Sequence, residues 1–253
     1  MINDIEINFT KKEGVDATIL IEGLPGIGQV GKLVAEYMID ELGAEKIAEI
    51  YSIYFPPHVI INADGVARLI NNELYYYGSS NKILFLVGDY QSATNEGHYL
   101  LVEKYLNIAQ QHGVKRIYTL GGYGVGHLVD VPRVLAAVNM KYLVSEVLSS
   151  GAIFNTNEPG TGIVGASGLL LGMSVTRNME AICLMGETSG YLVDPKSAKK
   201  LLEVLCKLLQ IEIDSTRLER RATEMEQFIE KLREERQREI DQENLDDDLR
   251  YIG

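Results

Sequence analysis

Short apolar runs alternate with segments of helical period through residues 1–211, and this alternation limits the chain to a few folds. The runs are rich in β-branched and aromatic residues and are bounded by Gly or polar residues, which is typical of strands buried on both faces. They cover residues 17–22, 46–52, 59–62, 66–70, 74–78, 82–88, 116–121, 134–138 and 181–186. The helical segments cover residues 29–42, 94–112, 140–150, 164–175 and 195–209. We therefore expect an α/β fold in which a largely parallel or mixed sheet is covered by helices on both faces.

Residues 59–78 contain closely spaced predicted strands separated by two turn signals. The signals are Ala63-Asp64-Gly65 and Asn71-Asn72. Gly, Asn and Asp favour tight turns because they tolerate backbone conformations that other residues avoid. We expect this segment to form an antiparallel meander inserted into the α/β pattern.

The composition changes near Glu212. From there to residue 250 Asp, Glu, Lys, Arg and Gln dominate, and Gly and Pro are absent, which favours a helix over residues 216–240. We divide the chain into an α/β domain at residues 1–211 and a charged helical tail at 212–253. The tail has one narrow apolar stripe, suited to docking on a neighbour or a partner helix but too small for a separate core. The stripe consists of Leu218, Ala222, Met225, Ile229 and Leu232.

The net charge of −12 over 253 residues argues against a nucleic-acid or membrane partner, because both anionic surfaces favour a basic patch. The two cysteines, Cys183 and Cys206, lie in apolar segments and are expected to be buried free thiols in a reducing compartment. The N-terminal residues lack a signal-peptide pattern, and the weakly polar stretch 162–175 is too short to span a bilayer. We expect a cytoplasmic protein.

A glycine-rich turn follows the first predicted strand. Gly26, Gly28 and Gly31 match the dinucleotide-binding pattern G-x-G-x-x-G between a strand and a helix. The same residues almost match a phosphate-binding loop ending in Lys32, but Leu33 replaces the Ser or Thr that would bind Mg²⁺. A tight turn whose glycines permit close packing of helix on sheet is the interpretation we favour, with nucleotide binding as the alternative.

Other polar residues follow predicted strands, where α/β sheets bind their ligands. Asp89, His127 and Glu187 are the candidates for a general base in an enzyme. No nucleophile is paired with a base at a recognisable spacing, and the four histidines form no pair at helical spacing that would hold a metal. We favour a structural role in turns for these residues.

Several separated motifs resemble the proteasome assembly chaperone family, in particular its archaeal homologues. They occur in the order expected for that family between about residues 15 and 210. The motifs are Gly23-Leu24-Pro25-Gly26-Ile27-Gly28-Gln29-Val30-Gly31, Leu120-Gly121-Gly122-Tyr123, Pro132-Arg133-Val134, residues 165–171 and residues 184–188.

The resemblance implies a fold similar to the purine nucleoside phosphorylase and hydrolase class and a function without catalysis or cofactor. Members of the family act as ATP-independent scaffolds for assembly of the proteasome core particle, and the archaeal ones form homo-oligomers. The strand-end residues then serve as structural turns. These residues are Gly23, Pro25, Gly26, Gly28, Gly31, Gly121 and Gly122.

The resemblance also points to the C-terminus as the partner-binding segment. Some members end in a hydrophobic residue, a tyrosine and any residue, and this tail inserts between adjacent α-ring subunits with its carboxylate paired to a lysine. Here the chain ends Tyr251-Ile252-Gly253, so Ile252 replaces the penultimate tyrosine. The expected contacts to the core-particle α subunits are made by Leu249, Tyr251, Ile252 and Gly253.

Two hypotheses follow. The first is a non-enzymatic, homo-oligomeric chaperone or adaptor that docks on the proteasome α-ring through its C-terminal tail. The second is a nucleotide- or nucleoside-binding enzyme that uses the glycine-rich loop at residues 26–32 with Asp89, His127 or Glu187. A coiled-coil module for another partner is a weaker third possibility, because charges interrupt the apolar seam of the tail.

Overall fold

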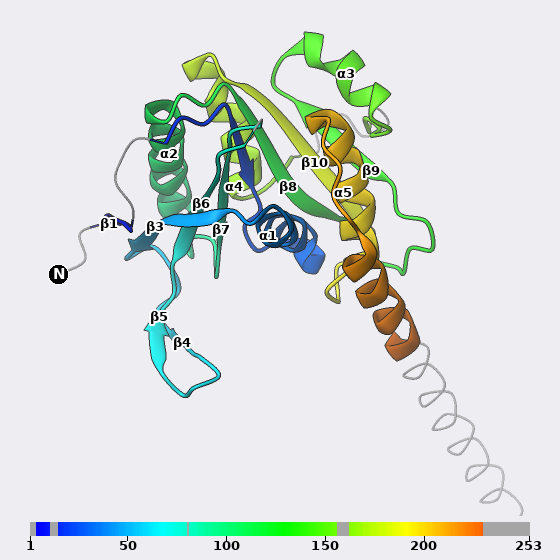
Figure 1. Cartoon of the computed structure of the whole chain (residues 1–253), viewed down its shortest axis with the longest axis horizontal. Coiled ribbons are helices and arrows are strands. Elements are labelled where there is room, and N and C mark those ends of the chain that lie inside the picture. The colour runs from blue at the N-terminus through cyan, green and yellow to red at the C-terminus, as the bar shows by residue number, and fades with distance from the viewer. Residues whose placement is uncertain (1–3, 11–14, 80, 156–161, 230–253) are drawn as a thin grey trace, which may run out of the picture.

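The protein is built around one large mixed sheet. The computed structural model describes residues 4–10, 15–79, 81–155 and 162–229 (Figure 1). The strands of the sheet are β1 (Ile5–Phe9), β2 (Ile19–Glu22), β3 (Glu45–Ser52), β6 (Asn72–Tyr77), β7 (Ile83–Gly88), β8 (Arg116–Gly124), β9 (Val134–Val138) and β10 (Glu180–Thr188). Their order is β1-β3-β6-β7-β2-β8-β10-β9. The four strands β7, β2, β8 and β10 run parallel, and the flanking pairs are antiparallel, so the predicted mixed sheet is confirmed.

Helices pack on both faces of this sheet. They are α1 (Val30–Leu42), α2 (Asn95–Gln111), α3 (Val144–Ser149), α4 (Ala166–Met173) and α5 (Pro195–Leu209). One core lies between the sheet and α1, α3 and α5, and the other lies between the sheet and α2 and α4. Adjacent residues of β2 illustrate the two layers, because Leu20 enters one core and Ile21 the other. The apolar runs are continuous because both faces of the central strands are buried.

Local capping sets where two of the helices begin. The side chain of Thr94 accepts a hydrogen bond from the Gly97 amide at 3.1 Å at the start of α2. At α5, Asp194 accepts from the Ser197 amide at 2.9 Å, and Pro195 occupies the first helical position. These are the cap and the proline position that favour helix initiation.

The predicted meander is wrong in its pairing. Strands β4 (Val59–Ile61) and β5 (Ala67–Leu69) form a hairpin with a sheet of their own, whereas β6 pairs with β3 and β7 in the main sheet. The second turn signal misled the prediction, because Asn72 begins β6 and is fully buried. The prediction also missed β1, a half-exposed edge strand of five residues, although Ile5, Ile7 and Phe9 alternate with polar residues as in a half-buried strand.

The charged C-terminal segment starts inside the packed body. Residues 216–229 are helical, and the side chain of Leu218 is fully buried in the core beneath α1 and α5. Tyr37 of α1 donates a hydrogen bond to the Asp214 carbonyl at 2.5 Å, and the Arg217 guanidinium lies 5.2 Å from the centre of the Tyr37 ring. The helix then points away from the body (Figure 1). A domain boundary between residues 211 and 212 remains a proposal.

Helix α1 approaches the sheet so closely that backbone meets backbone. A Cβ atom placed on Gly31 would lie 2.1 Å from the Leu120 carbonyl oxygen of β8, a distance that real Cβ atoms do not adopt. Gly23, just before the helix, is equally confined, because its Cβ would lie 2.4 Å from the Cβ of Ala35. Small residues at both positions therefore set the depth at which α1 sits.

Two polar side chains, one buried and one half-buried, fasten α4 to the turn after β2. Glu22 is fully buried, and it accepts hydrogen bonds from the Leu24 amide at 3.0 Å and from the Ser167 hydroxyl at 2.9 Å. Gln91 donates to the Pro25 carbonyl at 2.7 Å and accepts from the Ala166 amide at 2.9 Å. Burial raises the pKa of Glu22 to about 7, because the charged form is desolvated.

We predict that Gly31→Ala lowers the free energy of unfolding by about 1–3 kcal/mol, because the added methyl group forces α1 away from β8. Gly172→Ala in α4 is the matched control, since nothing lies within 4 Å of its Cβ position. This control should be neutral or stabilising by up to about 1 kcal/mol. Urea unfolding of the three proteins measures both effects, and an unchanged midpoint for Gly31→Ala would contradict the packing account.

We predict that Glu22→Gln makes stability less dependent on pH. Unfolded Glu22 ionises near pH of about 4.3, so the folded protein retains a proton that the unfolded chain has lost. The stability due to Glu22 is therefore present below that pH and is lost as the pH rises towards 7. The variant should gain stability over the wild type between about pH 5 and about pH 8, by up to about 3 kcal/mol.

Urea unfolding across this pH range tests the Glu22 prediction. Glu224→Gln serves as the control for loss of a surface carboxylate, because its side chain is 66% exposed. A difference between Glu22→Gln and wild type that stays constant with pH would show that Glu22 is not the titrating group.

Candidate partner-binding site

The carboxyl ends of β2, β8 and β10 surround a hollow of about 690 Å³. It is lined by the turn at Ile27, by the glycine-rich segments 121–124 and 162–165, and by Gln91 and Ser167. Among the described residues its lining includes no Asp, Glu, Lys or Arg. His98 also lines the hollow, and burial lowers its pKa, so a phosphate group placed there would meet no positively charged side chain at neutral pH, although backbone amides are the other common donors to phosphate.

The glycine-rich turn after β2 is occupied by contacts within the protein. Gly28 has a φ of +62°, and a Cβ there would lie 2.7 Å from the Thr188 hydroxyl of β10. A Cβ on Gly122 would lie 2.1 Å from the Ile27 carbonyl oxygen. Gly26 and Gly121 have more room, with no neighbour nearer than 3.8 Å to their Cβ positions. Most of the turn is thus shaped by packing against the ends of β8 and β10.

The lysine of the possible phosphate loop is also engaged. The Lys32 ammonium donates to the Gly88 carbonyl at 3.0 Å and lies 3.6 Å from the Glu36 carboxylate. The positive charge of Lys32 is therefore used within the protein, by the carbonyl at the end of β7 and by a carboxylate one turn along its own helix. This arrangement favours the structural interpretation of the loop over the nucleotide-binding one.

Asp89 holds the base of the β4–β5 hairpin. Its carboxylate accepts hydrogen bonds from Arg68 at 2.6 and 2.8 Å and from the Asn71 amide at 3.0 Å. Burial alone would raise the pKa of Asp89, but the hydrogen bonds from Arg68 and Asn71 outweigh it and lower the pKa. A carboxylate held in this way is a weak general base.

Glu187 and His127 are likewise engaged locally. The buried Glu187 carboxylate accepts from the Arg133 side chain, at 2.8 Å from Nε, and from the Arg133 amide at 3.1 Å. These hydrogen bonds lower the pKa of Glu187. His127 is exposed, and its Nδ1 lies 3.0 Å from the Val125 carbonyl. Within the described part of the chain no hydrogen bond joins any two of the three candidates.

The cysteines and histidines form no reactive centre that the structure describes. Burial raises the pKa of Cys183 to about 12 and that of Cys206 to about 11, so both thiols are protonated at neutral pH. Over the described ranges no cluster of His, Cys, Asp and Glu has the arrangement of a metal site. No described helix has both the length and the apolar character needed to cross a bilayer.

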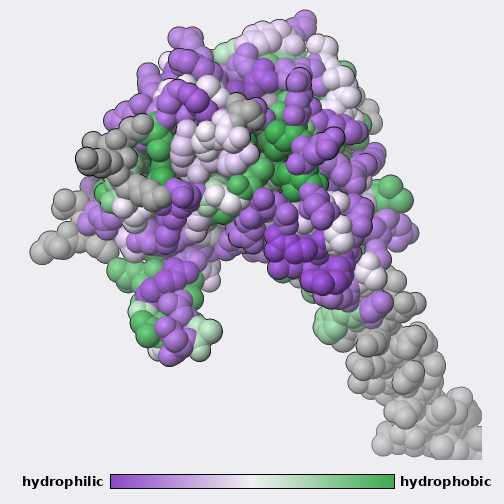
Figure 2. Space-filling model, viewed as in Figure 1, coloured by the Kyte–Doolittle hydropathy of each residue, from purple (hydrophilic) through white to green (hydrophobic). Residues whose placement is uncertain are grey.

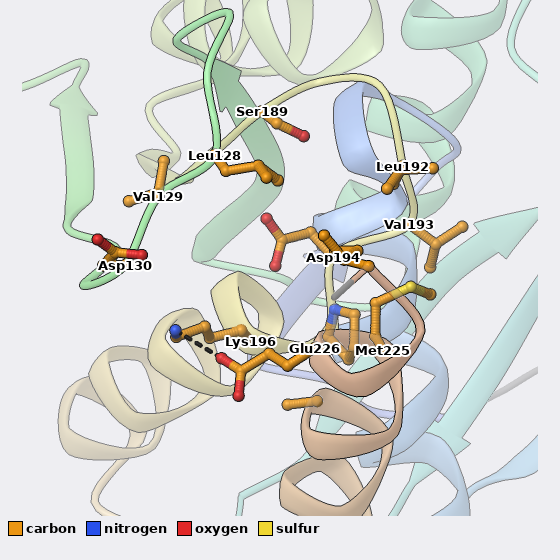
Figure 3. Close-up of a pocket in the computed structure, with 13 residues that line it drawn as sticks. Leu128, Val129, Asp130, Ser189, Leu192, Val193, Asp194, Lys196, Met225 and Glu226 are labelled. Carbon is orange, nitrogen blue, oxygen red and sulfur yellow. Dashed lines mark ion pairs between the residues drawn. The ribbon is translucent and has the colours of Figure 1, made fainter. Parts of the chain in front are cut away.

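A groove of about 270 Å³, lined by both apolar and charged side chains, lies where the C-terminal helix leaves the body (Figure 3). Met225 of that helix, Leu128 of the loop after β8 and Val193 of the turn before α5 line it. The Lys196 ammonium pairs with the Glu226 carboxylate at 2.6 Å and ties the helix to α5. The apolar stripe of the tail thus divides, with Leu218 buried in the core and Met225 lining the groove.

The residues expected to contact the α-ring lie outside the described residues. Leu249, Tyr251, Ile252 and Gly253 belong to the segment 230–253, as does Leu232 of the predicted stripe. The sequence predicted Met225 as part of the apolar stripe, but not the groove that it lines, because the groove residues outside its helix come from two separate segments of the chain. Leu192 and Val193, two apolar residues in the turn before Pro195, were the available signal.

Arg68, Gln91 and Arg133 were missed as partners of the candidate residues. Each reaches a group 18 or more positions away in the chain, for example Arg68 to Asp89 and Gln91 to Ala166. Spacing in the sequence carries no signal for such pairs. Glu22 did carry a signal in the sequence, because it is the only charged residue in the apolar run 17–22.

Comparisons with known proteins agree with this architecture. Pyrococcus furiosus PbaB, an archaeal proteasome activator, is 39% identical, with a TM-score of 0.86 over 91% of this chain and 99% of that one. Protein MJ1210 of Methanocaldococcus jannaschii is 41% identical over 95% of this chain and 94% of its own length. P. furiosus PbaA, a homolog of proteasome-assembly chaperone, shares the fold at 24% identity and a TM-score of 0.76.

A family model also matches most of the chain. Residues 20–233 match the PAC2 family, a range that begins within β2 and includes the other parallel strands, α1 to α5 and the described part of the C-terminal helix. The resemblance to archaeal proteasome assembly chaperones is confirmed, and the chain belongs to the PAC2 family.

Proposed function

We propose that this chain is a non-enzymatic, homo-oligomeric chaperone or adaptor of the cytoplasm that docks on the α-ring of the proteasome core particle through its C-terminal tail. The similarity to PbaB, an archaeal proteasome activator, carries the proposal because it extends over 91% of this chain at 39% identity. The candidate catalytic carboxylates support it, since Asp89 and Glu187 are both engaged by arginines.

The C-terminal helix gives the tail a suitable starting point. Residues 216–229 form a helix anchored at Arg217, Leu218 and Glu226, and its C-terminal end points away from the body (Figure 1). The described part of this helix ends away from the sheet (Figure 1). The tail thus begins at a position from which it can reach a partner without the domain itself having to fit against the ring.

The terminal residues supply apolar contact area. Full burial of Tyr251 and Ile252 would contribute about 1.5–3 kcal/mol each, and ordering of the tail offsets part of this gain. Several tails on one homo-oligomer would recover affinity, because after the first tail binds the others do so at high effective concentration. This multivalency is how a tail lacking the penultimate tyrosine would still dock.

Deletion of residues 251–253 should abolish binding to the core particle and leave the fold and the oligomer intact. Ile252→Tyr should instead strengthen binding by about threefold to tenfold, because a phenol hydroxyl adds a hydrogen bond worth about 1 kcal/mol. Pull-down on immobilised core particle, with circular dichroism as the folding control, measures both. Unchanged recovery of the truncated protein would rule out tail docking.

The second candidate function is a nucleotide- or nucleoside-binding enzyme with a fold similar to purine nucleoside phosphorylases. The hollow of about 690 Å³ at the strand ends favours it, because α/β sheets bind ligands at this place. We expect no heat of binding in calorimetry with a panel of nucleotides and nucleosides, with or without Mg²⁺. Saturable micromolar binding would support the enzyme instead.

A further inference from the structure

The β4–β5 hairpin projects from the body as a separate arm (Figure 1). Its strands, Val59–Ile61 and Ala67–Leu69, pair only with each other. The turn between them is closed by hydrogen bonds from the Asn62 amide to the Val66 carbonyl and from the Gly65 amide to the Asn62 carbonyl, each 2.9 Å long. A two-stranded hairpin is marginally stable by itself in water, so its faces need partners.

One face of the hairpin is anchored to the domain. Ile60 is half-buried and packs against the core between the sheet and α2. Arg68, its partner across the strands, donates two hydrogen bonds to the Asp89 carboxylate. These contacts fix the orientation of the arm and therefore the direction in which its other face points.

The other face is apolar and uncovered. Side chains alternate along a strand, so Val59 and Ile61 share this face with their cross-strand partners Leu69 and Ala67. Val59, Ile61 and Leu69 are 48%, 70% and 49% exposed. Figure 2 shows the hydrophobic residues on the projecting arm. Contiguous exposed apolar side chains of this kind mark protein–protein contact surfaces.

An apolar recess continues this face at the base of the arm. It has a volume of about 390 Å³, and Ile53, Phe55 and Pro56 line it. Val59 and Leu69 line it as well, so they belong both to the recess and to the exposed face of the hairpin. The surface therefore combines a raised apolar tip at Ile61 with a neighbouring apolar hollow.

Charge favours a second copy of this chain as the occupant of this surface. The chain carries a net charge of −12, so most approaches of two copies bring like charges together. Residues 50–72 hold one acidic residue, Asp64, and one basic residue, Arg68, and so have no net charge. The recess is lined by no Asp, Glu, Lys or Arg among the described residues. A cationic partner would be attracted to the acidic surfaces of the chain rather than to this face. A second copy is also acidic, so it packs with least electrostatic repulsion on a neutral face.

We propose that the β4–β5 hairpin is a self-association surface, on which the face formed by Val59, Ile61, Ala67 and Leu69 packs against a second copy of this chain. Ile61 of one copy enters the recess lined by Phe55 and Pro56 of the other. This inference rests on the proposed homo-oligomeric function and specifies the contact that holds its copies together.

Ile61→Glu tests the proposal directly. The side chain is exposed, so the charge is tolerated in a single copy but would be buried without a partner at the contact. Val131→Glu is the matched control, because Val131 is 79% exposed and lies off the hairpin. Light scattering over a concentration series should show at least a tenfold rise in the dissociation concentration for Ile61→Glu and the wild-type mass for Val131→Glu.

Two results would overturn the proposal. One is a wild-type protein that stays monomeric throughout the concentration series. The other is an Ile61→Glu variant, with wild-type circular dichroism, that keeps the wild-type mass. If that variant keeps its mass but loses binding to the core particle, the hairpin contacts the ring and the self-association proposal is wrong.

Crossing these variants with the tail deletion separates this inference from tail docking. The Ile61→Glu variant retains its tail and should still bind immobilised core particle, with faster release because fewer tails engage at once. The protein lacking residues 251–253 should keep the wild-type mass but lose binding. A third outcome is that Ile61→Glu dissociates into single copies while the protein lacking residues 251–253 still binds the core particle. That outcome would support the hairpin contact and contradict docking through the tail.

Discussion

The backbone contact between α1 and β8 determines the geometry of the carboxyl end of the sheet. Gly31 lets the helix approach until its Cβ position is 2.1 Å from the Leu120 carbonyl. The turn that precedes the helix must then fit beside Gly122 and Thr188, and it does so through Gly28 at positive φ. A pattern that resembles a nucleotide-binding fingerprint thus follows from how deeply one helix sits.

Polar side chains at the strand ends hold the neighbouring loops in place. Glu22 and Gln91 join the turn after β2 to α4, Arg133 joins Glu187 to the start of β9, and Arg68 joins the hairpin to Asp89. Glu22 and Glu187 are buried, so removal of their partners leaves a buried carboxylate with unsatisfied hydrogen-bonding capacity, which costs more than the pair itself contributes. The carboxylates that a catalytic interpretation would use therefore hold the scaffold together.

The sequence predicted the core of the fold because periodicity reports burial. The apolar runs at β2, β7, β8 and β10 and the helical segments from α1 to α5 were all identified. It failed where partners are distant in the chain. Nothing local shows that Asn72 enters the main sheet, that Arg68 reaches Asp89, or that Met225 faces Leu128 across a groove. The predicted contact residues of the tail, by contrast, came from resemblance alone.

A rigid domain with a projecting helix and a projecting hairpin suits a protein that holds other proteins together. The central proposal is that the chain binds the proteasome core particle as a scaffold. Light scattering of the full chain mixed with purified α-rings, without added nucleotide, tests it most directly. The account predicts one species heavier than the ring by a whole-number multiple of 28.2 kDa. Two separate species of unchanged mass would contradict it.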